Sequence, residues 1–569
     1  MPTAEEIKQQ LTGPGGPFEV VTEQVRGRPM QVYKERMRAL RQICEIAIGR
    51  GDDTFIVYGD RDVTFADFIT SSYTTSKGLD TFGVTHGDRV AVLSQNNPEW
   101  CLTFWGTVNL GAVLVGLNGW WTNDEIIYGL QDSGSKVLVA DAKRFERIAG
   151  SLDDCPDLEH VFLIDSDPSV FGDDKRLHRF DELLADKTDT APTAAIDEDD
   201  YAVIFYTSGT TGRPKGAIST HRSMIANLQN TIYGSVAGAM LGSGAIPQGD
   251  GGQTVALFTS PLFHVSGCHS TLVVGMIAGL KLVMIDGRFE PRKALELIQQ
   301  HKISLWATVP TMVWRVCEDP DRHDYDTSSI VSVAFGGSPS ADELQRKVHE
   351  TFPNVTTTTN AYGLTESSSV ATAISGKDAI DKPTSVGPPV PTMEIKIRDS
   401  AGTEVPAGQT GEVTMYGPLI MAGYWNKPEA TAETVRDGWL YTGDIGRLDA
   451  DGFLFITDRK KDMIIRGGEN IYCVEIENRL VEHPAIADAA VIGVPHPQLG
   501  EEVKAVVQLE PGETLTEQEV RAWVAEALAN FKVPAYVELR HDKLPRNASG
   551  KLLKNVLRGE GEVSFAETM

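Results

Sequence analysis

Cysteine is scarce in this sequence, and the few residues present are far apart. The 569 residues include six cysteines, and no two of them form a C-x-x-C pair. They are Cys44, Cys101, Cys155, Cys268, Cys317 and Cys473. This spacing argues against a disulfide framework or a zinc site and favours a reducing compartment.

Long hydrophobic runs are missing as well. The best candidate for a membrane span is residues 271–280, about half of the ~20 residues that a spanning helix needs, and Lys281 ends it. We therefore expect a buried helix there, followed by a strand at 282–285. Residues 1–6 are acidic without an apolar signal region, and residues 565–569 carry neither an SKL nor a CaaX signal. We expect a cytoplasmic protein with no transmembrane segment; peripheral membrane contact stays open.

Positive charge is outnumbered by negative charge. The 52 Lys and Arg residues face 79 Asp and Glu residues, which gives a formal net charge of −27 and a pI near 4.9. The average field repels nucleic acid, so we expect no nucleic-acid partner. An acidic protein that binds ATP must concentrate positive charge locally. A Lys or Arg beside a glycine-rich loop is therefore informative here.

Short apolar strands alternate with helical patterns along most of the chain. The length exceeds one ordinary domain, and 41% hydrophobic residues with a mean hydropathy of −0.18 are typical of a globular protein. We predict strands at 90–93, 136–139, 255–258, 282–285, 304–306 and 331–334. We predict helices at 100–110, 123–131, 291–300 and 310–317. This alternation indicates an α/β architecture with largely parallel sheets.

The pattern changes after residue 384. Short strands that suggest antiparallel pairing occur at 394–397, 411–414 and 453–456, and a charged, exposed segment follows at 458–462. Beyond it, an α+β unit is predicted from helices at 474–482 and 517–530 and strands at 489–492 and 503–508. We therefore predict two domains, residues 1–458 and 459–569. The Gly/Pro run at 13–17 predicts a flexible entry segment.

A glycine-rich loop, TSGTTGRPKG at 207–216, directly follows an apolar strand at 201–206. Its glycines let backbone N–H groups approach an anion, its hydroxyls add donors, and Lys215 adds a positive charge, a combination that suits a triphosphate. It is not a Walker A motif, because Pro214 stands where that motif has its second glycine. The next residues predict a second strand, with a helix after Thr220. On these residues alone, a polar hairpin stays the alternative.

Six further segments follow this loop in order: PLFHVSG at 261–267, FGGSPS at 335–340, NAYGLTE at 360–366, YTGD at 441–444, DRKKDMIIRGGENI at 458–471 and PRNASGK at 545–551. With them the chain, from roughly Thr54 onward, resembles the adenylate-forming superfamily of acyl-CoA synthetases, luciferases and peptide-synthetase adenylation domains. It is most similar to a bacterial fatty-acid–CoA ligase. The resemblance implies a large N-terminal domain of α/β sheets with a small β-barrel-like subdomain, and a small mobile α+β C-terminal domain.

The resemblance also implies the site residues. Lys551, from the C-terminal domain, would bridge the acyl carboxylate and the α-phosphate of ATP. By the same resemblance His264 is a further catalytic residue. Glu366 and Thr207 would hold Mg²⁺, for which carboxylate and hydroxyl oxygens are suitable ligands. Further residues would bind ATP and coenzyme A: Ser208, Gly209, Thr210, Thr211, Gly212, Lys215, Gly337, Ser338, Pro339, Asn360, Ala361, Tyr362, Gly363, Thr365, Asp444, Ile456, Arg459, Gly467 and Gly468.

The chemistry of several of these residues matches the group that each would contact. Tyr362 offers a flat face for adenine, although a buried core tyrosine is the commoner role. Asp444 carries two acceptor oxygens that match the vicinal hydroxyls of ribose, with Arg459 assisting; a turn-capping aspartate is the alternative. Lys461 matches the hinge about which the C-terminal domain is thought to rotate. The glycine pair at 467–468 would line the channel for the pantetheine arm.

The acid is the least determined part of the prediction. By resemblance its pocket is lined by mostly small or apolar residues: His264, Val265, Cys268, Thr308, Met312, Gly337 and Leu364. Cys268 stands where some long-chain enzymes carry a gating tryptophan, so fatty, aryl and polycyclic or steroid-type acids all stay open. His264 stands where amino-acid adenylation domains carry an aspartate. Acyl transfer to a carrier protein, luciferase-like oxidation and a non-catalytic nucleotide-binding role also stay open, as does a homodimer.

Overall fold

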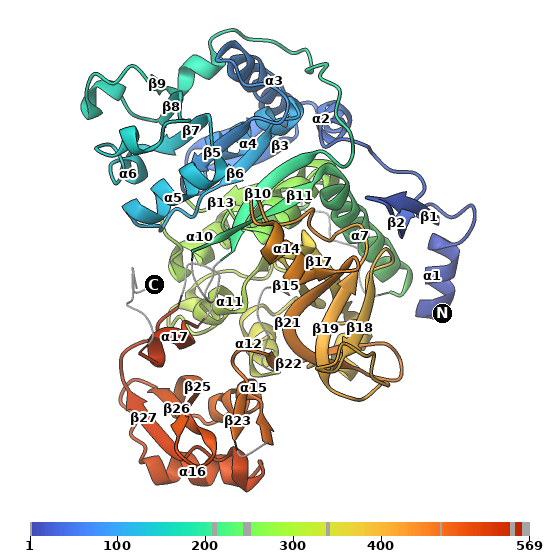
Figure 1. Cartoon of the computed structure of the whole chain (residues 1–569), viewed down its shortest axis with the longest axis vertical. Helices are drawn as coiled ribbons and strands as arrows, with labels where there is room; N and C mark the ends of the chain where they lie inside the picture. Colours follow the sequence, from blue (N-terminus) through green and yellow to red (C-terminus); the bar gives the residue numbers. More distant parts are fainter. Residues whose placement is uncertain are drawn as a thin grey trace. The chain divides into compact units, whose positions relative to one another are not determined.

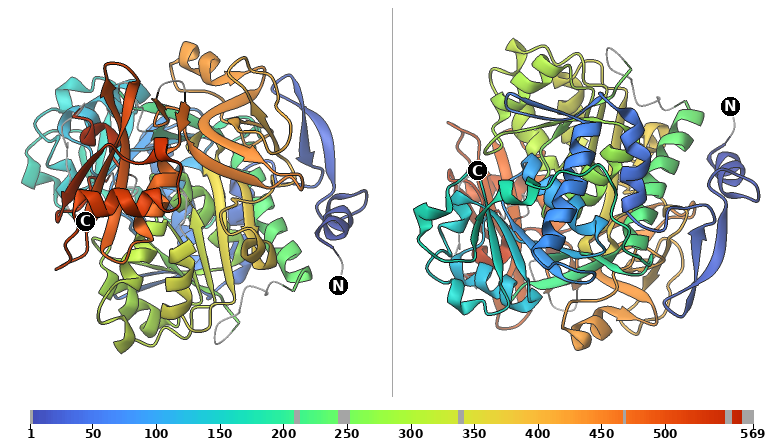
Figure 2. Two further views of the ribbon diagram at one scale, coloured as in Figure 1. Left: turned by 90° about the horizontal axis from the view of Figure 1, so that it is seen from below. Right: turned by 90° about the horizontal axis from the view of Figure 1, so that it is seen from above.

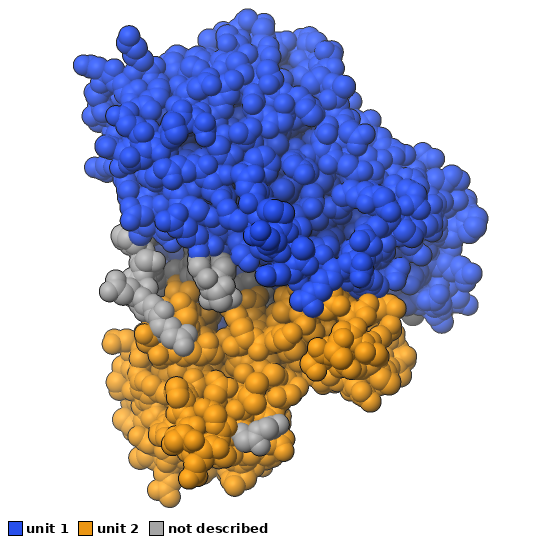
Figure 3. Space-filling view, viewed as in Figure 1, with its two compact units in different colours: residues 1–337, 346–395, 415–440 blue, residues 338–345, 396–414, 441–569 orange. Residues whose placement is uncertain are grey.

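The computed structural model describes residues 3–207, 213–242, 252–336, 342–466, 469–546 and 552–559. It contains two compact units, coloured separately in Figure 3. Unit 1 comprises residues 1–337, 346–395 and 415–440, and unit 2 comprises residues 338–345, 396–414 and 441–569. Each unit is described by itself below.

Unit 1 contains a seven-stranded sheet that is parallel except at one edge. Its strands follow the order β11 (Lys215–Thr220), β10 (Tyr201–Thr207), β6 (Val113–Gly116), β5 (Arg89–Leu93), β7 (Val137–Asp141), β8 (His160–Ile164) and β9 (Leu177–Arg179). The edge pair β10–β11 is antiparallel. The predicted strand at 201–206 and the second strand after the loop are thus both present.

A second, eight-stranded sheet lies in the same unit. Its order is β17 (Ser369–Ser375), β16 (Thr357–Leu364), β15 (Ser332–Gly336), β14 (Leu305–Thr308), β12 (Val255–Phe258), β13 (Lys281–Met284), β3 (Thr54–Tyr58) and β4 (Arg61–Thr64). The inner pairs are parallel, whereas β16–β17 and β3–β4 at the two ends are antiparallel. The predicted α/β architecture with largely parallel sheets is therefore confirmed.

The main core of unit 1 lies between these two sheets. Helices α3 (Phe65–Thr81) and α4 (Pro98–Asn109) pack there, and their buried side chains share one apolar cluster with residues from both sheets. The right-hand view of Figure 2 shows these two blue helices between the sheets. Trp100, Phe104 and Trp105 of α4 have no exposed surface. Burying such large aromatic side chains supplies much of the hydrophobic stabilisation of the unit.

Helices connect the strands of unit 1, and Figure 1 shows most of them. They are α2 (Arg41–Ala47), α5 (Asn123–Ser133), α6 (Ala142–Phe145), α7 (His221–Met240), α8 (Val265–Gly267), α9 (Val274–Ala278), α10 (Pro291–His301), α11 (Pro310–Cys317), α13 (Gly376–Asp381) and α14 (Pro428–Thr434). Helix α12 (Asp342–Thr351) follows β15 in the chain. The predicted buried helix at 271–280 is formed by the π-helix η5 (Cys268–Val273) and α9. Among helices of the described residues, none combines the length and apolarity that crossing a bilayer requires.

The N-terminal segment of unit 1 is well ordered, so the prediction of a flexible entry at 13–17 is wrong. Helix α1 (Ala4–Thr12) precedes it, and the hairpin of β1 (Val20–Val25) and β2 (Arg28–Tyr33) follows it. Within the segment, the Gly16 N–H donates to the Gly13 carbonyl at 3.0 Å, and the Phe18 N–H donates to the Leu11 carbonyl at 2.9 Å. The glycines therefore form a defined turn, because their own backbone bonds close it.

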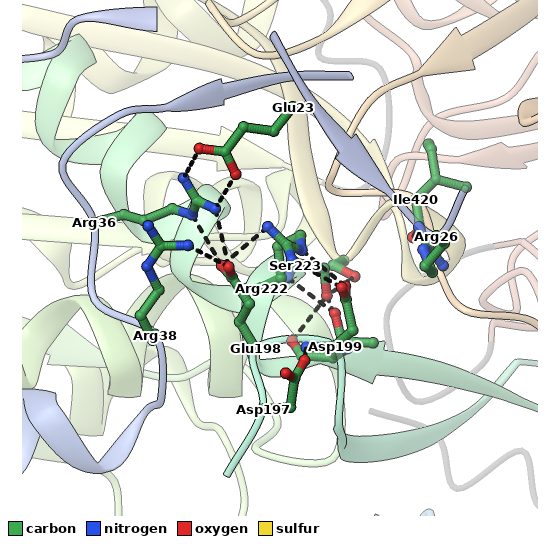
Figure 4. A network of polar contacts seen from close by, with 12 residues as sticks. Glu23, Arg26, Arg36, Arg38, Asp197, Glu198, Asp199, Arg222, Ser223 and Ile420 are labelled. Atoms are coloured by element: carbon green, nitrogen blue, oxygen red, sulfur yellow. Dashed lines mark hydrogen bonds and ion pairs between the residues drawn. The ribbon is translucent and has the colours of Figure 1, made fainter. Parts of the chain in front are cut away.

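Charged side chains anchor this hairpin to the rest of unit 1. Arg36, whose side chain is 4% exposed, donates to Glu23 of β1 at 2.7 Å and to Glu198 at 2.9 Å. Arg38 also pairs with Glu198, and Arg222 of α7 pairs with Glu198 and with Asp199 (Figure 4). We call these six residues the arginine network: Glu23, Arg36, Arg38, Glu198, Asp199 and Arg222.

A third sheet of five strands follows in the chain. Its strands are β18 (Glu394–Arg398), β19 (Gly411–Tyr416), β21 (Trp439–Leu448) and β20 (Val435–Arg436), with β22 (Leu454–Arg459) paired to β21. The described pairs β20–β21 and β21–β22 are antiparallel, and β18, β19 and β22 lie where strands were predicted.

Unit 2 includes a five-stranded sheet of the C-terminal part. Its order is β24 (Glu469–Ile471), β23 (Ile464–Arg466), β26 (Gly500–Leu509) and β25 (Ile486–His496), with β27 (Tyr536–Arg540) paired to β26. Helices α15 (Cys473–Val481) and α16 (Glu517–Ala525) contribute Ile476, Leu480, Val520 and Val524 to its core. Helix α17 (Lys554–Leu557) closes the described chain. The predicted α+β composition is confirmed, although α16 ends earlier than residue 530.

Candidate functional site

The ends of the predicted phosphate loop are held by an antiparallel pair of strands. Thr207, the last residue of β10, lies opposite Lys215, the first residue of β11, and the Thr207 hydroxyl donates to the Lys215 carbonyl at 3.4 Å. Strand β10 is buried on both sides, which fixes the position of its end. Residues 208–212 of the predicted loop, Ser208, Gly209, Thr210, Thr211 and Gly212, lie outside the described residues.

Glu366 lies close to this hairpin through Tyr424. Glu366 belongs to the short turn η7 (Thr365–Ser367) after β16, and its Oε1 accepts a hydrogen bond from the Tyr424 hydroxyl at 2.8 Å. The Lys215 ammonium lies over the Tyr424 ring at 5.2 Å from its centre. Burial and the neighbouring carboxylate of Glu366 raise the pKa of Tyr424, so its hydroxyl stays protonated and donates. Tyr424 thus connects the lysine of the loop to the predicted metal ligand.

No local pattern in the sequence indicates Tyr424. The segment that carries it runs along the free edge of β11: Ala422 N–H donates to the Ile218 carbonyl, and Ile218 N–H donates to the Gly423 carbonyl, each at 3.0 Å. The Trp425 N–H donates to the Gly216 carbonyl at 2.8 Å. These bonds join residues about two hundred positions apart, so no local pattern indicates them. A tyrosine after glycine in a turn gives no signal of its own.

The predicted nucleotide residues Asn360, Ala361, Tyr362, Gly363 and Thr365 lie on β16 and at the start of η7. Asn360 is 6% exposed; its amide donates to the Ser385 carbonyl at 3.1 Å, while its Oδ1 has no hydrogen-bond partner among the described residues. A buried acceptor without a partner destabilises the fold unless a ligand supplies a donor. Asn360 therefore fits a ligand that carries an N–H group, such as adenine.

Gly363 is required by a close approach of two backbone segments. A Cβ atom at this position would lie 1.6 Å from the Ser369 carbonyl oxygen, so no other residue fits without moving β16 or β17. The neighbouring turn contains Ser368 and Ser369 at positive φ, 48° and 113°, which non-glycine residues rarely adopt. The Ser368 hydroxyl forms hydrogen bonds with the hydroxyls of Ser219 and Ser223 at 3.1 and 2.9 Å. These bonds hold the turn directly after Glu366 in one conformation.

The predicted acid-pocket residues come from two regions of unit 1. His264 caps α8, Val265 opens it, and Cys268 begins η5, where its side chain is fully buried in the main core. Thr308 ends β14, and its hydroxyl donates to the sulfur of Met312 at 3.3 Å. Leu364 ends β16 and is partly buried. Gly337, Ser338 and Pro339 lie outside the described residues.

In unit 2, Asp444 and Arg459 lie opposite each other, on β21 and β22. Asp444 is 4% exposed, and its Oδ1 lies 3.3 Å from Nε of Arg459. Ile456 is on β22 as well, opposite Gly446. Glu412, which no sequence motif indicates, accepts from the Gly443 N–H at 3.2 Å and from Lys460 at 3.0 Å. It therefore orders the backbone just before Asp444.

The predicted hinge residue Lys461 is exposed, but the prediction that all of 458–462 is exposed is wrong. Asp458 is 3% exposed and Asp462 is 9% exposed. Asp458 accepts from the N–H groups of Arg459, at 2.7 Å, and of Cys473. Asp462 lies 3.3 Å from Arg558. Alternating charge suggested a solvated segment, whereas partners far along the chain bury two of its carboxylates.

A buried group of charges surrounds this hinge segment, and we call Asp458, Cys473, Glu477 and Lys554 the hinge cluster. Lys554 of α17 lies 2.7 Å from Glu477 of α15, with side chains 10% and 14% exposed. Burial raises the pKa of Asp458 to about 6, although Lys554 and the two N–H groups oppose this shift. Burial alone would lower the pKa of Lys554, but Glu477, Cys473 and Asp458 raise it. Gly467, Gly468 and Lys551 lie outside the described residues.

The donors around Glu366 fit a single hard cation. Among the described residues, Oε2 of Glu366 has no hydrogen-bond partner, and Thr207 offers a second oxygen. No group of three or more His, Cys, Asp or Glu residues that could hold a metal ion occurs in the described chain. A cation with one or two protein oxygens and the remaining ligands from phosphate and water is the mode typical of Mg²⁺ with a nucleotide.

The chain matches two family models. Residues 45–425 match the AMP-binding enzyme family, and residues 475–551 match the AMP-binding enzyme C-terminal domain. The chain is 34% identical over 534 residues to the "Long-chain-fatty-acid--CoA ligase" of Bacillus subtilis (strain 168), with 90% of this chain and 92% of that protein covered. The predicted resemblance to the adenylate-forming superfamily is therefore confirmed.

Two further comparisons agree. The chain is 35% identical over 523 residues to the "3-[(3aS,4S,7aS)-7a-methyl-1,5-dioxo-octahydro-1H-inden-4-yl]propanoyl:CoA ligase" of Rhodococcus jostii (strain RHA1), covering 90% of this chain and 96% of that protein. A solved structure of the anthranilate CoA ligase AuaEII with anthranoyl-AMP matches with a TM-score of 0.83 at 26% identity, over 92% of this chain and 97% of that one. The chain belongs to the AMP-binding enzyme family.

Proposed function

We propose that this protein is an ATP-dependent acyl-CoA ligase that acts on an apolar carboxylic acid. In the first step the acid and ATP form an acyl-adenylate with release of pyrophosphate. In the second step the acyl group passes to coenzyme A with release of AMP. The link from Lys215 through Tyr424 to Glu366, with Thr207 opposite Lys215 at the end of the loop, is the observation that carries the proposal.

This arrangement suits the polyphosphate of ATP. Lys215 supplies a positive charge beside the ends of the loop strands, and Glu366 supplies a carboxylate oxygen a few ångströms beyond Tyr424. Glu366 and Thr207 would hold Mg²⁺, which would neutralise phosphate charge. Asn360 offers adenine a buried acceptor, and Asp444 with Arg459 suits the ribose hydroxyls. Each group complements the chemistry of one part of ATP.

In the first step an oxygen of the acid carboxylate attacks the α-phosphorus. A C–O–P bond forms, the bond to the β-phosphate oxygen breaks, and pyrophosphate leaves with that electron pair. We propose that Lys551 reduces the repulsion between the two anions and stabilises the negative charge on the α-phosphoryl oxygens. Positioning of the two reactants supplies much of the remaining rate enhancement.

In the second step the sulfur of coenzyme A attacks the acyl carbonyl carbon, and AMP leaves with the electrons of the broken C–O bond. The thiol has a pKa of about 8.5, so a fraction of the coenzyme A molecules is already ionised near neutrality and no strong base is needed. We propose that residues 459–569 rotate about Lys461 between the steps, so that Lys551 withdraws and Gly467 and Gly468 line the path of the pantetheine arm.

The relatives support three classes of acid. Their names specify a long-chain fatty acid, a propanoyl side chain on a fused bicyclic ring, and anthranilate. All three acids present a carboxylate on a largely apolar body. The predicted pocket residues Val265, Cys268 and Met312 offer no charge, which favours such a body. We propose a fatty or similarly apolar acid; an aryl or polycyclic acid, or transfer to a carrier protein, is the second candidate.

The test is a pyrophosphate-release screen over acids of graded length and ring content, with and without coenzyme A. We expect acid-dependent ATP–pyrophosphate exchange without coenzyme A, and a thioester and AMP when it is added. Exchange without thioester formation would favour a carrier-protein acceptor. No exchange with any acid would overturn the proposal. We also expect a cytoplasmic enzyme, because ATP and coenzyme A are found there and the six cysteines are free.

Lys551→Ala tests the role of the catalytic lysine. We expect acyl-adenylate formation to fall roughly 10²- to 10³-fold, because one group that stabilises developing charge is lost. Thioester formation from supplied acyl-adenylate should be largely unchanged. Equal loss in both steps, measured by single-turnover assays, would contradict the role.

Lys461→Pro tests the hinge. Proline fixes φ near −65°, so a rotation that depends on this residue is hindered. We expect the thioester step to slow by more than the adenylation step, and the neutral variant Lys461→Ala to affect both steps weakly. If the thioester step of Lys461→Pro proceeds at the parent rate, rotation about this residue is refuted.

A further inference from the structure

The tip of the N-terminal hairpin has an unusual residue. Strands β1 and β2 pair with Val25 opposite Arg28, so Arg26 and Gly27 form a two-residue turn. Both have positive φ, 48° and 77°. Turns with positive φ at both positions match the twist of a hairpin, and Asn, Asp and Gly are the residues that usually occupy them. We therefore expect contacts of the Arg26 side chain to offset the strain of this backbone conformation.

The Arg26 side chain reaches two carbonyl groups far along the chain. Its Nη1 donates to the Met421 carbonyl at 2.9 Å, and its Nη2 donates to the Ile420 carbonyl at 2.7 Å. Figure 4 shows Arg26 beside Ile420, away from the arginine network. Ile420 and Met421 are 2% and 1% exposed. The planar guanidinium is suited to holding two neighbouring acceptors at once, and a charged donor strengthens both bonds.

The same peptide segment holds Glu366. The Met421 N–H donates to the Glu366 carbonyl at 2.9 Å, while the Met421 carbonyl accepts from Arg26. Three residues later, the Tyr424 hydroxyl donates to the Glu366 carboxylate. Glu366 is therefore fixed at its main chain and at its side chain by residues of one short segment. Arg26 holds the same segment through the carbonyls of Ile420 and Met421.

The hairpin does not need Arg26 for its own attachment. Arg36 joins β1 to Glu198, and the Tyr416 hydroxyl donates to the Pro29 carbonyl at 2.8 Å. Val25, Met30 and Val32 form an apolar cluster with Val21 and Tyr416. These contacts hold β1 and β2 in place without a contribution from the Arg26–Gly27 turn. The bonds of Arg26 therefore act mainly on residues 420–421.

We propose that Arg26 is a positioning residue of the ATP site, which holds Glu366 in place through the segment of Ile420, Met421 and Tyr424. This inference rests on the proposed function of Glu366 as the Mg²⁺ ligand. The hairpin lies outside the family match, which begins at residue 45. The N-terminal segment of this chain thus contributes to a site whose residues Lys215, Glu366 and Tyr424 lie within that match.

The experiment compares Arg26→Met with Arg26→Lys and with the matched control Arg28→Met. Arg28 belongs to the same hairpin, and its only described ion pair, with Asp437 at 3.9 Å, is exposed on both sides. Such a surface pair contributes little. Acid-dependent ATP–pyrophosphate exchange is measured over a range of Mg²⁺ and ATP concentrations, and thioester formation is measured from supplied acyl-adenylate.

For Arg26→Met we expect the Mg²⁺ concentration for half-maximal exchange to rise roughly tenfold, since two buried carbonyls lose charged donors. Arg26→Lys should recover part of this loss, and Arg28→Met should resemble the parent. The thioester step should be unchanged in all three variants. An unchanged Mg²⁺ dependence in Arg26→Met, or equal loss in both steps, would overturn the proposal.

Two additional measurements keep the inference separate from the proposed function. If the parent shows no exchange with any acid, the proposed function fails, and the rise in melting temperature caused by Mg²⁺ with ATP then tests Arg26 without turnover. A smaller rise for Arg26→Met than for Arg28→Met supports the inference, and equal rises overturn it. In the double variant with Tyr424→Phe, the two losses should be less than multiplicative, because both substitutions act through Glu366.

Discussion

The arginine network of unit 1 and the hinge cluster of unit 2 each contain a largely buried carboxylate, Glu198 and Asp458, and the pKa values of these two shift in opposite directions. Burial raises the pKa of Glu198, but hydrogen bonds from Arg36 and Arg38 outweigh it and the net pKa is lowered. The hydrogen bond from Arg36 lowers the pKa of Glu23. Asp458 in the hinge cluster instead has its pKa raised to about 6.

The difference lies in the number and kind of donors. Glu198 has three arginines around it, and guanidinium groups donate several hydrogen bonds in fixed directions. Asp458 accepts from two backbone N–H groups, while the nearby ammonium of Lys554 is bonded to Glu477. Desolvation therefore dominates at Asp458. The arginine network therefore anchors the N-terminal hairpin at all ordinary pH values. The hinge cluster instead contains a carboxylate, Asp458, that changes its charge near pH 6.

The largest effect is expected from Lys554→Met. Removing the ammonium leaves Glu477 and Asp458 buried without a cation, which costs about 3–5 kcal/mol in the free energy of unfolding. Trp523 is the only tryptophan of unit 2, so a fluorotryptophan signal in urea reports that unit by itself. The control Lys504→Met removes a more exposed pair with Glu538 and should lose less than about 1 kcal/mol. Similar losses for both variants would contradict the assignment.

A smaller effect is expected on the pH dependence of the stability of unit 2. Because the pKa of Asp458 is raised from 3.8 to about 6 on folding, the folded protein binds more protons than the unfolded chain between these values. The stability of unit 2 should therefore fall as pH rises through this window. Asp458→Asn should remove that part of the slope, measured as the urea midpoint of the Trp523 signal between pH 4 and about 6.5. If parent and variant slopes coincide, Asp458 does not titrate there.

The arginine network should respond to acid in the opposite sense. The pKa values of Glu23 and Glu198 are lowered, so their contribution is present above their usual value of 4.5 and is lost as pH falls below it. The smallest effect is expected for Arg38→Met. Its side chain is 51% exposed, and Glu198 keeps Arg36 and Arg222, so the loss should stay below about 1 kcal/mol in a thermal melt. A larger loss than for Arg36→Met would reverse this ranking.

Local patterns in the sequence predicted elements well wherever short-range signals agree. The strand at 255–258 and the helix at 310–317 have the predicted bounds, and α7 begins directly after Thr220 as expected. Helix α16 ends at Ala525, before the predicted end at residue 530, because Phe531 and Val533 turn back to pack against the core of unit 2. Propensity continues the helix there, but tertiary packing ends it.

The site was predictable to the extent that its motifs are local. Thr207 and Lys215 face each other because a strand precedes and follows their loop, and the sequence shows both strands. Tyr424, Glu412 and Arg26 could not be predicted, because each acts through bonds to residues tens or hundreds of positions away. The burial of Asp458 escaped prediction for the same reason: its partners Cys473 and Lys554 are distant in sequence.

The contact of Arg26 with Ile420 and Met421 bears on how this protein is divided for expression or for chimeras. A fragment that starts at residue 45, where the family match begins, retains the glycine-rich loop and Glu366 but omits the hairpin and Arg36. Such a fragment would leave the carbonyls of Ile420 and Met421 without Arg26, and Glu198 with Arg222 as its remaining arginine partner. Swaps of acid-binding segments between relatives should therefore transfer residues 1–44 together with the segment around residue 420, so that both ends of the contact come from one parent.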